Sequence, residues 1–471
     1  MTRTLLNFIV AALVSIAASA QTQSSGAAGV WSGAIEVPAS PLAIVVRLVT
    51  GGDGWRGTID IPAQGAKSIG LVDVTVSPPA VSFRIPNAPG DPTIKLTLAE
   101  DGSRMTGTLT QGGATIPVSL TRGEPPARKR PQTPARPFPY DEEEVTVRNE
   151  TAGITLAGTF TRPRGGGRYP AVLLLTGSGQ QDRDETLFEH KPFLVLSDYL
   201  TRRGIAVLRL DDRGVGGSDR GPLGITSKDL AGDALAGVAF LRGRPDVDPA
   251  RVGLVGHSEG AMLAAMAAAE SPDIAFIVMV AGTGVPGDWI LLAQAEAAAK
   301  TGGASDAVIA WDRSVRERVY KLLAAETDGK PDPAARQRLL DEVATLTAPG
   351  LPENASRDLA SALLKAGSQP WLRYFLVYDP RQALAKVKVP VLAIGGERDL
   401  QVPAAENLKE IEGAIKANGN ADVTTVLLPG LNHLMQTSAT GAVAEYSTIE
   451  ETFAPAALQL IGDWIVKRTS R

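Results

Sequence analysis

The sequence predicts two domains, an all-β N-terminal domain and a larger α/β domain built around a mostly parallel sheet of about eight strands. Residues 29–122 hold short runs of alternating polar and apolar residues separated by Gly, Asp and Pro, as in antiparallel strands joined by hairpins. From residue 143 onward, apolar runs alternate with helical stretches, which is the pattern of parallel strands buried on both faces. Residues 288–376 interrupt this alternation with helical sequence alone.

The first twenty residues have the pattern of a secretory signal peptide. Arg3 gives a positive start, residues 5–17 are apolar, and residues 18–20 form a small-residue cleavage site. The apolar stretch is shorter than the roughly 20 residues that a membrane-spanning helix needs. We therefore expect an exported protein, periplasmic or extracellular, whose mature chain begins near Gln21 and has no integral membrane span.

Composition narrows the possible classes of function. The chain has 471 residues, which is long enough for two or more structural units. Its 47 basic and 51 acidic side chains leave a net charge of -4, which gives no reason to expect a nucleic-acid partner. The sequence contains no cysteine, which excludes cysteine nucleophiles, thiolate zinc sites and iron–sulfur clusters. We expect no metal and no cofactor.

The all-β domain is expected at residues 21–124, as a barrel or a sandwich. Its β-type runs are GVWSGAIEV, LAIVVRLV, WRGTIDIP, IGLVDVTV, AVSFRIP, TIKLTLA, MTGTLTQ and TIPVSLT. Residues 125–142 follow with a sequence rich in proline and charge. Such a sequence cannot form a packed core, and it predicts a stiff, exposed linker.

The α/β domain is expected in two parts, at residues 143–287 and 377–471, separated by a helical cap at residues 288–376. Its buried-strand runs are AVLLLTG, GIAVLRL, RVGLVGH, AFIVMVAG, VPVLAIGG and VTTVLLPG. EEVTVRN and ITLAGTFTRP precede them as an antiparallel entry to the same sheet. Because open α/β sheets bind ligands outside the carboxyl ends of their strands, an insertion on that side is expected to cover the site.

The chemistry of the chain centres on residues 256–260, GHSEG, which fit the pattern G-x-S-x-G. A strand-like run precedes them and an alanine-rich helical stretch follows. At such a strained strand-to-helix turn, larger side chains beside the serine would collide with the neighbouring backbone. The amino end of the helix favours the negative charge that develops when serine attacks a carbonyl. We predict that Ser258 is a nucleophile rather than a turn residue.

A serine hydroxyl needs a general base, and the chain offers three histidines. His257 lies next to the nucleophile and is expected to point elsewhere on the turn. For His190, before the second parallel strand, we expect a packing or capping role. His433 follows the last parallel strand, in a loop that reaches the carboxyl edge of the sheet. We predict that His433 is the base.

The acid that orients the base should lie between the serine and the histidine in chain order. The loop after the strand VPVLAIGG offers Glu397 and Asp399. We predict Asp399 as the acid and Glu397 as a solvated charge. The order Ser258, Asp399, His433 is that of α/β-hydrolases and differs from the orders in chymotrypsin and subtilisin.

An oxyanion hole requires backbone N–H groups aimed at the developing charge. We predict the amide of Glu259 as one donor and the amide of Ser178, in the loop after the first parallel strand, as the second, with Gln180 next in line. Trp371 and Phe375 lie at helical spacing in PWLRYFLVYDP. Core packing is the default role for these two side chains, with lining of an acyl pocket as the alternative.

Five motifs, in order, resemble those of EstD-type carboxylesterases, a branch of the α/β-hydrolase superfamily near the serine aminopeptidases. They are TGSGQQDRDE, DDRGVGGSD, GHSEG, YDPRQALAKVKVPVLAIGGERDLQVP and LPGLNHLMQ, and the resemblance covers roughly residues 140–471. It implies an α/β-hydrolase sheet with a helical cap and hydrolysis of short-chain acyl esters by Ser258, Asp399 and His433. Family members commonly have proline at the position of Gln180 and glycine at that of Ala261.

Together these observations predict an exported serine carboxylesterase that works through an acyl-enzyme on a small-molecule ester. One alternative is a peptidase or aminopeptidase on the same fold, which needs an acidic subsite for the amino terminus of its substrate. The other is that the β domain binds an envelope glycan or lipid, for which Trp31, Trp55 and Phe83 are the available aromatic residues.

Overall fold

The computed structural model divides the chain into two compact units, one holding most of the chain up to Pro125 and the other holding Pro126–Arg471. It describes residues 26–37, 41–62, 66–86, 88, 90–111, 114–125, 129–326 and 330–470. The predicted signal peptide lies outside these residues. Within them, no helix combines the length and the apolar character that crossing a membrane requires.

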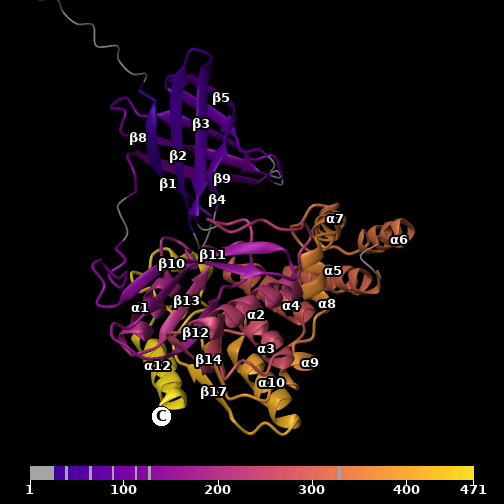
Figure 1. Cartoon of the computed structure of the whole chain (residues 1–471). Coiled ribbons are helices and arrows are strands. Elements are labelled where there is room, and N and C mark those ends of the chain that lie inside the picture. The colour runs from indigo at the N-terminus through magenta and orange to yellow at the C-terminus, as the bar shows by residue number, and fades with distance from the viewer. Residues whose placement is uncertain are drawn as a thin grey trace, which may run out of the picture. The chain divides into compact units, whose positions relative to one another are not determined.

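The N-terminal unit is a nine-stranded antiparallel sheet that closes almost completely into a barrel (Figure 1), which confirms the predicted all-β domain. The strand order is β4-β3-β2-β1-β9-β8-β7-β6-β5. The strands are β1 (Gly29–Ile35), β2 (Leu42–Gly51), β3 (Gly54–Ile61), β4 (Ala66–Gly70), β5 (Val72–Ser77), β6 (Ala80–Arg84), β7 (Thr93–Leu98), β8 (Arg104–Gln111) and β9 (Ala114–Arg122).

The barrel closes within a run of sequence that we expected to be one strand, IGLVDVTV. The structure divides this run at Leu71 into β4, which pairs with β3, and β5, which pairs with β6. The chain thus passes here from one edge of the sheet to the other, and the Leu71 N–H donates to the Gly57 carbonyl (2.9 Å). Trp31 and Phe83 are buried in the barrel core. They therefore do not offer their rings to an external ligand.

The second unit is built on an eight-stranded sheet in the order β10-β11-β13-β12-β14-β15-β16-β17 (Figure 1). The strands are β10 (Asp141–Asn149), β11 (Ile154–Arg162), β12 (Tyr169–Leu175), β13 (Ala206–Leu210), β14 (Val247–His257), β15 (Ile277–Val280), β16 (Val391–Gly396) and β17 (Val423–Leu428). The six strands from β12 to β17 are parallel, and β11 runs antiparallel to both β10 and β13. This confirms the predicted mostly parallel sheet with an antiparallel entry.

Helices cover both faces of this sheet (Figure 1). On one face lie α1 (Pro192–Arg202) and α12 (Pro455–Thr469), and on the other lie α2 (Ser227–Gly243), α3 (Glu259–Glu270) and α10 (Ala404–Ala417). The short helices α9 (Arg381–Leu384) and α11 (Val443–Tyr446) lie in connections.

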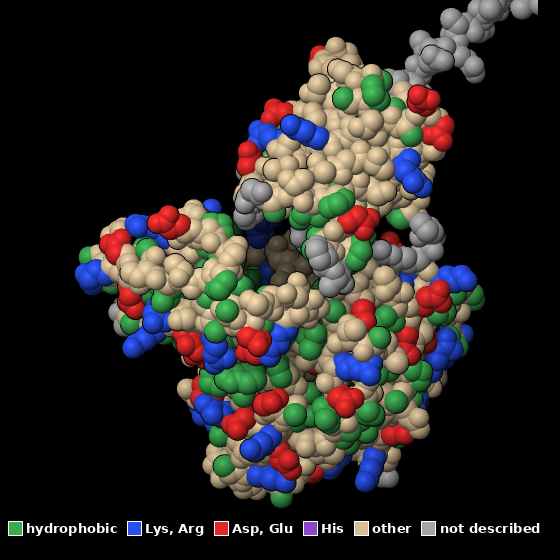
Figure 2. All heavy atoms as spheres, turned by 180° about the vertical axis from the view of Figure 1, so that it is seen from behind, with side chains coloured by type: hydrophobic (Ala, Val, Ile, Leu, Met, Phe, Trp, Pro, Cys, Tyr) green, Lys and Arg blue, Asp and Glu red, His purple; other side chains and the backbone are tan. Residues whose placement is uncertain are grey.

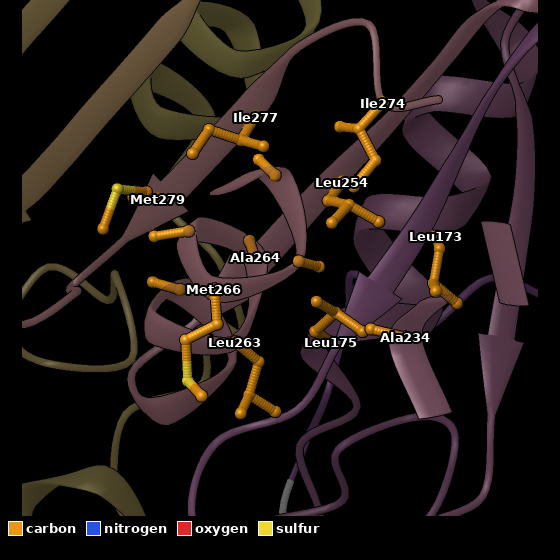
Figure 3. Close-up of a cluster of buried hydrophobic side chains, with 14 of the residues drawn as sticks. Leu173, Leu175, Ala234, Leu254, Leu263, Ala264, Met266, Ile274, Ile277 and Met279 are labelled. Carbon is orange, nitrogen blue, oxygen red and sulfur yellow. The ribbon is translucent and has the colours of Figure 1, made fainter. Parts of the chain in front are cut away.

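Two apolar cores result, because successive strand residues point to opposite faces of the sheet. In β12, Val172 and Leu174 belong to the core beneath α1 and α12, whereas Leu173 and Leu175 belong to the core beneath α2 and α3. Figure 3 shows part of the second core, with Leu263 and Met266 of α3 and Leu173, Leu175 and Leu254 of the strands. A strand buried on both faces needs a continuous apolar run, which explains why these strands are visible in the sequence.

The predicted cap is wholly helical in its described residues and lies between β15 and β16. It consists of α4 (Gly287–Thr301), α5 (Asp306–Ala325), α6 (Pro333–Val343), α7 (Ala355–Ala366) and α8 (Pro370–Val377). It has a core of its own that includes Val319, Val343 and Leu364.

A buried carboxylate joins three helices of the cap. Glu326, just after α5, accepts hydrogen bonds from Arg336 on α6 (2.6 and 2.8 Å) and from Arg373 on α8 (3.2 Å). The hydrogen bonds from Arg336 are the main cause that lowers the pKa of Glu326 to about 2. The carboxylate therefore holds the end of α5 against α6 and α8.

The proline-rich segment makes ordered contacts with the α/β unit from Arg130 onward. The Arg130 guanidinium donates to the backbone carbonyls of Phe188, Ser447 and Ile449, and the Gln132 side chain accepts hydrogen bonds from the amides of Thr452 and Phe453. On the face shown in Figure 2, described Lys and Arg side chains are interspersed with Asp and Glu side chains.

Candidate active site

The backbone turns sharply at Ser258, between β14 and α3. The serine has φ 54° and ψ −117°, in a region that side-chain-bearing residues rarely adopt. A Cβ at Gly256 would lie 2.0 Å from the Gly260 carbonyl oxygen, and a Cβ at Gly260 would lie 2.1 Å from the Leu175 carbonyl oxygen. Both glycines are therefore required, and the turn presents Ser258 at the carboxyl edge of the sheet.

Asp399 and His433 follow the neighbouring parallel strands β16 and β17, so their loops meet at that same edge. His433 Nδ1 lies 2.8 Å from Asp399 Oδ2, and both residues are buried, with 4% exposed. The other carboxylate oxygen accepts hydrogen bonds from the amides of Gln401 and Val402 (both 2.8 Å). A carboxylate only accepts, so Nδ1 of His433 carries the proton and Nε2 is left as the basic nitrogen.

The other carboxyl group of this loop, Glu397, lies away from His433. Glu397 is exposed and accepts a hydrogen bond from the Gly430 amide (2.9 Å). It is Asp399 that contacts His433. The rings of His433 and His257 lie 4.9 Å apart between centroids, which places the base beside the residue that precedes Ser258.

The loop after β12 packs directly against Ser258. A Cβ at Gly177 would lie 3.3 Å from Ser258 Cβ, and the next residue, Ser178, is exposed. Glu259 is the first residue of α3, so its N–H belongs to the first turn, whose amides have no partner within the helix. The Glu259 amide thus directly follows Ser258, and the loop that carries Ser178 contacts Ser258 through Gly177. The side chain of Gln180 donates to the Arg213 carbonyl (2.8 Å).

The side chain of Glu259 connects the turn to the cap. It is 3% exposed and accepts hydrogen bonds from Ser227 Oγ (2.5 Å) and Trp371 Nε1 (2.8 Å). Burial raises the pKa of this carboxyl group. Trp371 stacks on Phe375, with ring centroids 5.6 Å apart. Trp371 and Phe375, which the sequence predicts as core or acyl-pocket residues, both lie on α8. Trp371 contacts the turn at Ser258 through its hydrogen bond to Glu259.

Two carboxylates hold the loop that carries Ser178. The sequence does not single out Glu185, whereas for Asp212 it predicts a buried ion pair or a turn-fixing role. Glu185 accepts hydrogen bonds from the Gly177 amide (2.6 Å) and from His257 Nδ1 (2.8 Å). Asp212 accepts from Thr176 Oγ1 (3.0 Å) and the Gln181 amide (2.8 Å), and burial raises its pKa to about 7. Their contacts join residues from separate loops, which no sequence spacing reveals.

The third histidine supports the loop that follows the base. His190 is buried, with Nδ1 2.9 Å from Thr452 Oγ1 and Nε2 3.0 Å from the Tyr446 carbonyl oxygen. In the described part of the chain, no three His, Asp or Glu side chains are grouped so that they could hold a metal ion.

The sequence matches a known family over more than half of its length. The profile of the Alpha/beta hydrolase family matches residues 172–446. The chain is similar to Esterase EstD of Thermotoga maritima, with 29% identity over 303 residues, which cover 64% of this chain and 61% of that protein. An uncharacterised protein of Mycobacterium tuberculosis is 34% identical over 126 residues, which cover 27% of this chain and 41% of that protein.

The chain thus spans less than two thirds of the length of these relatives. Among solved structures, an esterase of Pyrococcus furiosus is similar at 18% identity and a TM-score of 0.40, over 74% of this chain and 99% of that chain. The chain belongs to the alpha/beta hydrolase family.

Proposed function

We propose that this alpha/beta hydrolase is an exported serine carboxylesterase that hydrolyses short-chain acyl esters through an acyl-enzyme. The observation that carries the proposal is the Asp399–His433 hydrogen bond of 2.8 Å beside the strained turn at Ser258. The similarity to Esterase EstD supports an ester as the substrate. The positive start and apolar stretch of the first twenty residues support export.

In the first half of the reaction, Ser258 Oγ attacks the ester carbonyl carbon while His433 Nε2 takes the hydroxyl proton. The carbonyl electron pair moves to oxygen, and the amides of Glu259 and Ser178 donate to the resulting oxyanion. Asp399 keeps the imidazole in the required tautomer and stabilises its charged form. The bond to the alcohol oxygen then breaks, the alcohol leaves with the proton from His433, and the acyl group stays on Ser258.

Water completes the second half of the reaction. The water oxygen attacks the acyl carbon while His433 takes a proton from that water, and the same amides hold the second oxyanion. When the bond to Ser258 breaks, the proton returns from His433 to Ser258 Oγ and the carboxylic acid leaves. Each proton taken up by the base is returned, so the cycle requires no redox partner.

The aromatic side chains of α8 support a short acyl group. Trp371 is fixed by its hydrogen bond to Glu259 and by stacking on Phe375, and Phe375 is itself buried. A rigid aromatic wall beside the nucleophile turn limits the length of chain that the acyl pocket accepts. Replacing Phe375 with a smaller residue should allow the enzyme to accept esters with longer acyl chains.

The environment of the site favours an ester over a peptide with a free amino terminus. Around the turn and the oxyanion loop, Glu185 and Glu259 are buried and Asp212 is half-buried, and each accepts hydrogen bonds from two protein groups. An aminopeptidase needs an acidic group that is available to the substrate's ammonium group. These three carboxylates are already engaged.

The proposal is tested by hydrolysis of p-nitrophenyl esters from acetate to palmitate, with aminoacyl anilides assayed in parallel. We expect the highest kcat/KM on the shortest esters, and a loss in kcat on the order of 10⁶ for Ser258→Ala. Ser271→Ala, at the other end of α3, is the matched control and should retain wild-type activity. A folded wild-type protein that is inactive on every ester would contradict the proposal.

A further inference from the structure

The imidazole of His257 lies at the junction of three loops. Its Nδ1 is 2.8 Å from Glu185 Oε1, in the loop after β12, and its Nε2 is 3.0 Å from the carbonyl oxygen of His433, in the loop after β17. Glu185 Oε1 also accepts the Gly177 amide (2.6 Å). One ring therefore links the oxyanion loop and the base loop to the turn that presents Ser258.

Both partners of this ring can only accept hydrogen bonds. A carboxylate and a backbone carbonyl have no proton to give, so both ring nitrogens of His257 must be donors, and an imidazole with two N–H groups is a cation. Glu185 is 1% exposed and His257 is 7% exposed, so water does not replace either partner. With Glu185 as a carboxylate, the geometry fits a buried imidazolium paired with it.

The surroundings of the ring favour the charged form. Among the described residues, the ionisable groups that face it are Glu185, Asp399 and His433, and α1 presents the apolar side chains of Phe193 and Leu196. Burial alone would lower the pKa of His257, but the charge and hydrogen bond of Glu185, with a smaller contribution from Asp399, raise it above its ordinary value. The proton is therefore held at a pH at which a free histidine has lost it.

We propose that His257 is a positioning residue that acts as a fixed imidazolium and keeps the oxyanion loop and the base loop in register with Ser258. This inference rests on the proposed function of the same site. Loss of the proton would turn a ring lone pair toward Glu185 or toward the His433 carbonyl, and one of the two loops would be released. Since His257 touches neither substrate nor the reacting atoms, its effect is on kcat rather than on KM.

The pH profile then has two limbs of different origin. On the acid side, activity requires the neutral base that accepts the serine proton, and at higher pH it falls as His257 loses its own proton. Because the folded-state pKa of His257 is raised, its stabilising contribution is complete below the ordinary value of about 6.5 and is lost as the pH rises through the folded-state value.

The proton count is tested by nuclear magnetic resonance of the full mature chain labelled with ¹⁵N-histidine. The chain has three histidines, so the His257→Gln and His433→Gln variants assign the ring signals. At pH 8 we expect two protonated ring nitrogens on His257. A neutral His257 with a single N–H at that pH would overturn the inference. The measurement needs no substrate, so it stands apart from failure of the esterase proposal.

The Glu185→Gln variant tests the functional consequence. It keeps the size of the side chain but removes the charge, so the alkaline limb of kcat should move to lower pH by about 1–3 units, while the acid limb stays in place. Glu397→Gln, in an exposed loop, is the matched control and should move neither limb. In His257→Gln, we expect the alkaline limb to disappear and kcat to fall by up to about 10²-fold with KM unchanged. An alkaline limb that is unmoved in Glu185→Gln would overturn the inference.

Discussion

Two carboxyl groups of one loop, Asp399 and Glu397, differ in every contact that matters for catalysis. Asp399 is buried, holds two backbone amides on one oxygen and His433 Nδ1 on the other, whereas Glu397 is exposed. A carboxylate in the first arrangement fixes the tautomer of the base and stabilises its positive charge. One in the second has neither effect.

Asp399→Asn should therefore lower kcat by about 10⁴-fold with little change in fold, because the amide stabilises the wrong tautomer of His433. Glu397→Gln changes the same chemical group in the same loop and should leave kcat within about twofold of wild type. The measurement is steady-state hydrolysis of p-nitrophenyl acetate. Near-normal activity of Asp399→Asn would show that Asp399 does not orient His433 in the reaction.

Single residues were predictable where a rule of chain order or of local geometry constrains them. The turn glycines, the nucleophile and the loops that carry the acid and the base follow from strand-to-helix sequence and from the order of the parallel strands. Glu185 was not predictable, because its partners Gly177 and His257 meet it only through folding and its own φ of 52° follows no sequence pattern.

At the scale of elements, the contact between α8 and the nucleophile turn depends on one indole N–H. Trp371→Phe keeps the aromatic wall but leaves the buried Glu259 carboxyl with Ser227 as its remaining side-chain donor. We expect a loss of about 1–3 kcal/mol in the free energy of unfolding and a fall in kcat/KM on short esters.

Trp311→Phe is the matched control for that variant. Trp311 Nε1 donates to Ser356 Oγ (2.6 Å) inside the cap, away from the turn. Trp311→Phe should lower the free energy of unfolding by a similar amount, with no loss in kcat/KM. Equal effects of the two variants on kcat/KM would show that the Trp371 contact acts only through stability.

The cap itself should respond to acid through Glu326. Its pKa is lowered to about 2, so its stabilising contribution is complete above the ordinary value of 4.5 and is lost as the pH falls from there toward about 2. Glu326→Gln should therefore lower the thermal unfolding midpoint at pH 7, and the difference from wild type should shrink at pH 3. Glu317→Gln, an exposed partner of Arg313, is the control. A difference that is independent of pH would contradict this role.

Strands and helices could be predicted where burial of their side chains restricts the sequence to an apolar pattern. The parallel strands β12 to β16 of the α/β unit are buried on both faces and show continuous apolar runs, and the cap helices show helical periodicity. The division of IGLVDVTV into β4 and β5 was missed, because the alternation of residues continues across Leu71 and the change of partner strand is decided by closure of the barrel.

At the scale of the whole molecule, the barrel should fold without the α/β unit. Its core is filled by its own side chains, including Trp31, Phe83 and Met105, and its edges meet through β4 and β5. We expect a fragment of residues 21–125 to give β-type circular dichroism and one cooperative thermal transition. A fragment without a cooperative transition would mean that the barrel depends on the rest of the chain.

The overall class of each unit follows from the type of periodicity that its sequence repeats, period two in the barrel and buried runs alternating with helices in the α/β unit. Whether the β sequence closes as a barrel or packs as a sandwich depends on which edge strands meet, and the hydrogen bond from the Leu71 N–H, between β4 and β5, to the Gly57 carbonyl of β3 lies where the sheet closes. The local sequence pattern therefore does not distinguish a barrel from a sandwich.

The central claim is that Ser258 is the nucleophile of a serine hydrolase, and the most direct test is covalent capture by a fluorophosphonate followed by mass spectrometry. The account predicts one adduct per chain, mapped to Ser258, absent in Ser258→Ala and retained in Ser271→Ala. Failure of the folded wild-type protein to react, or an adduct on any other residue, would contradict it.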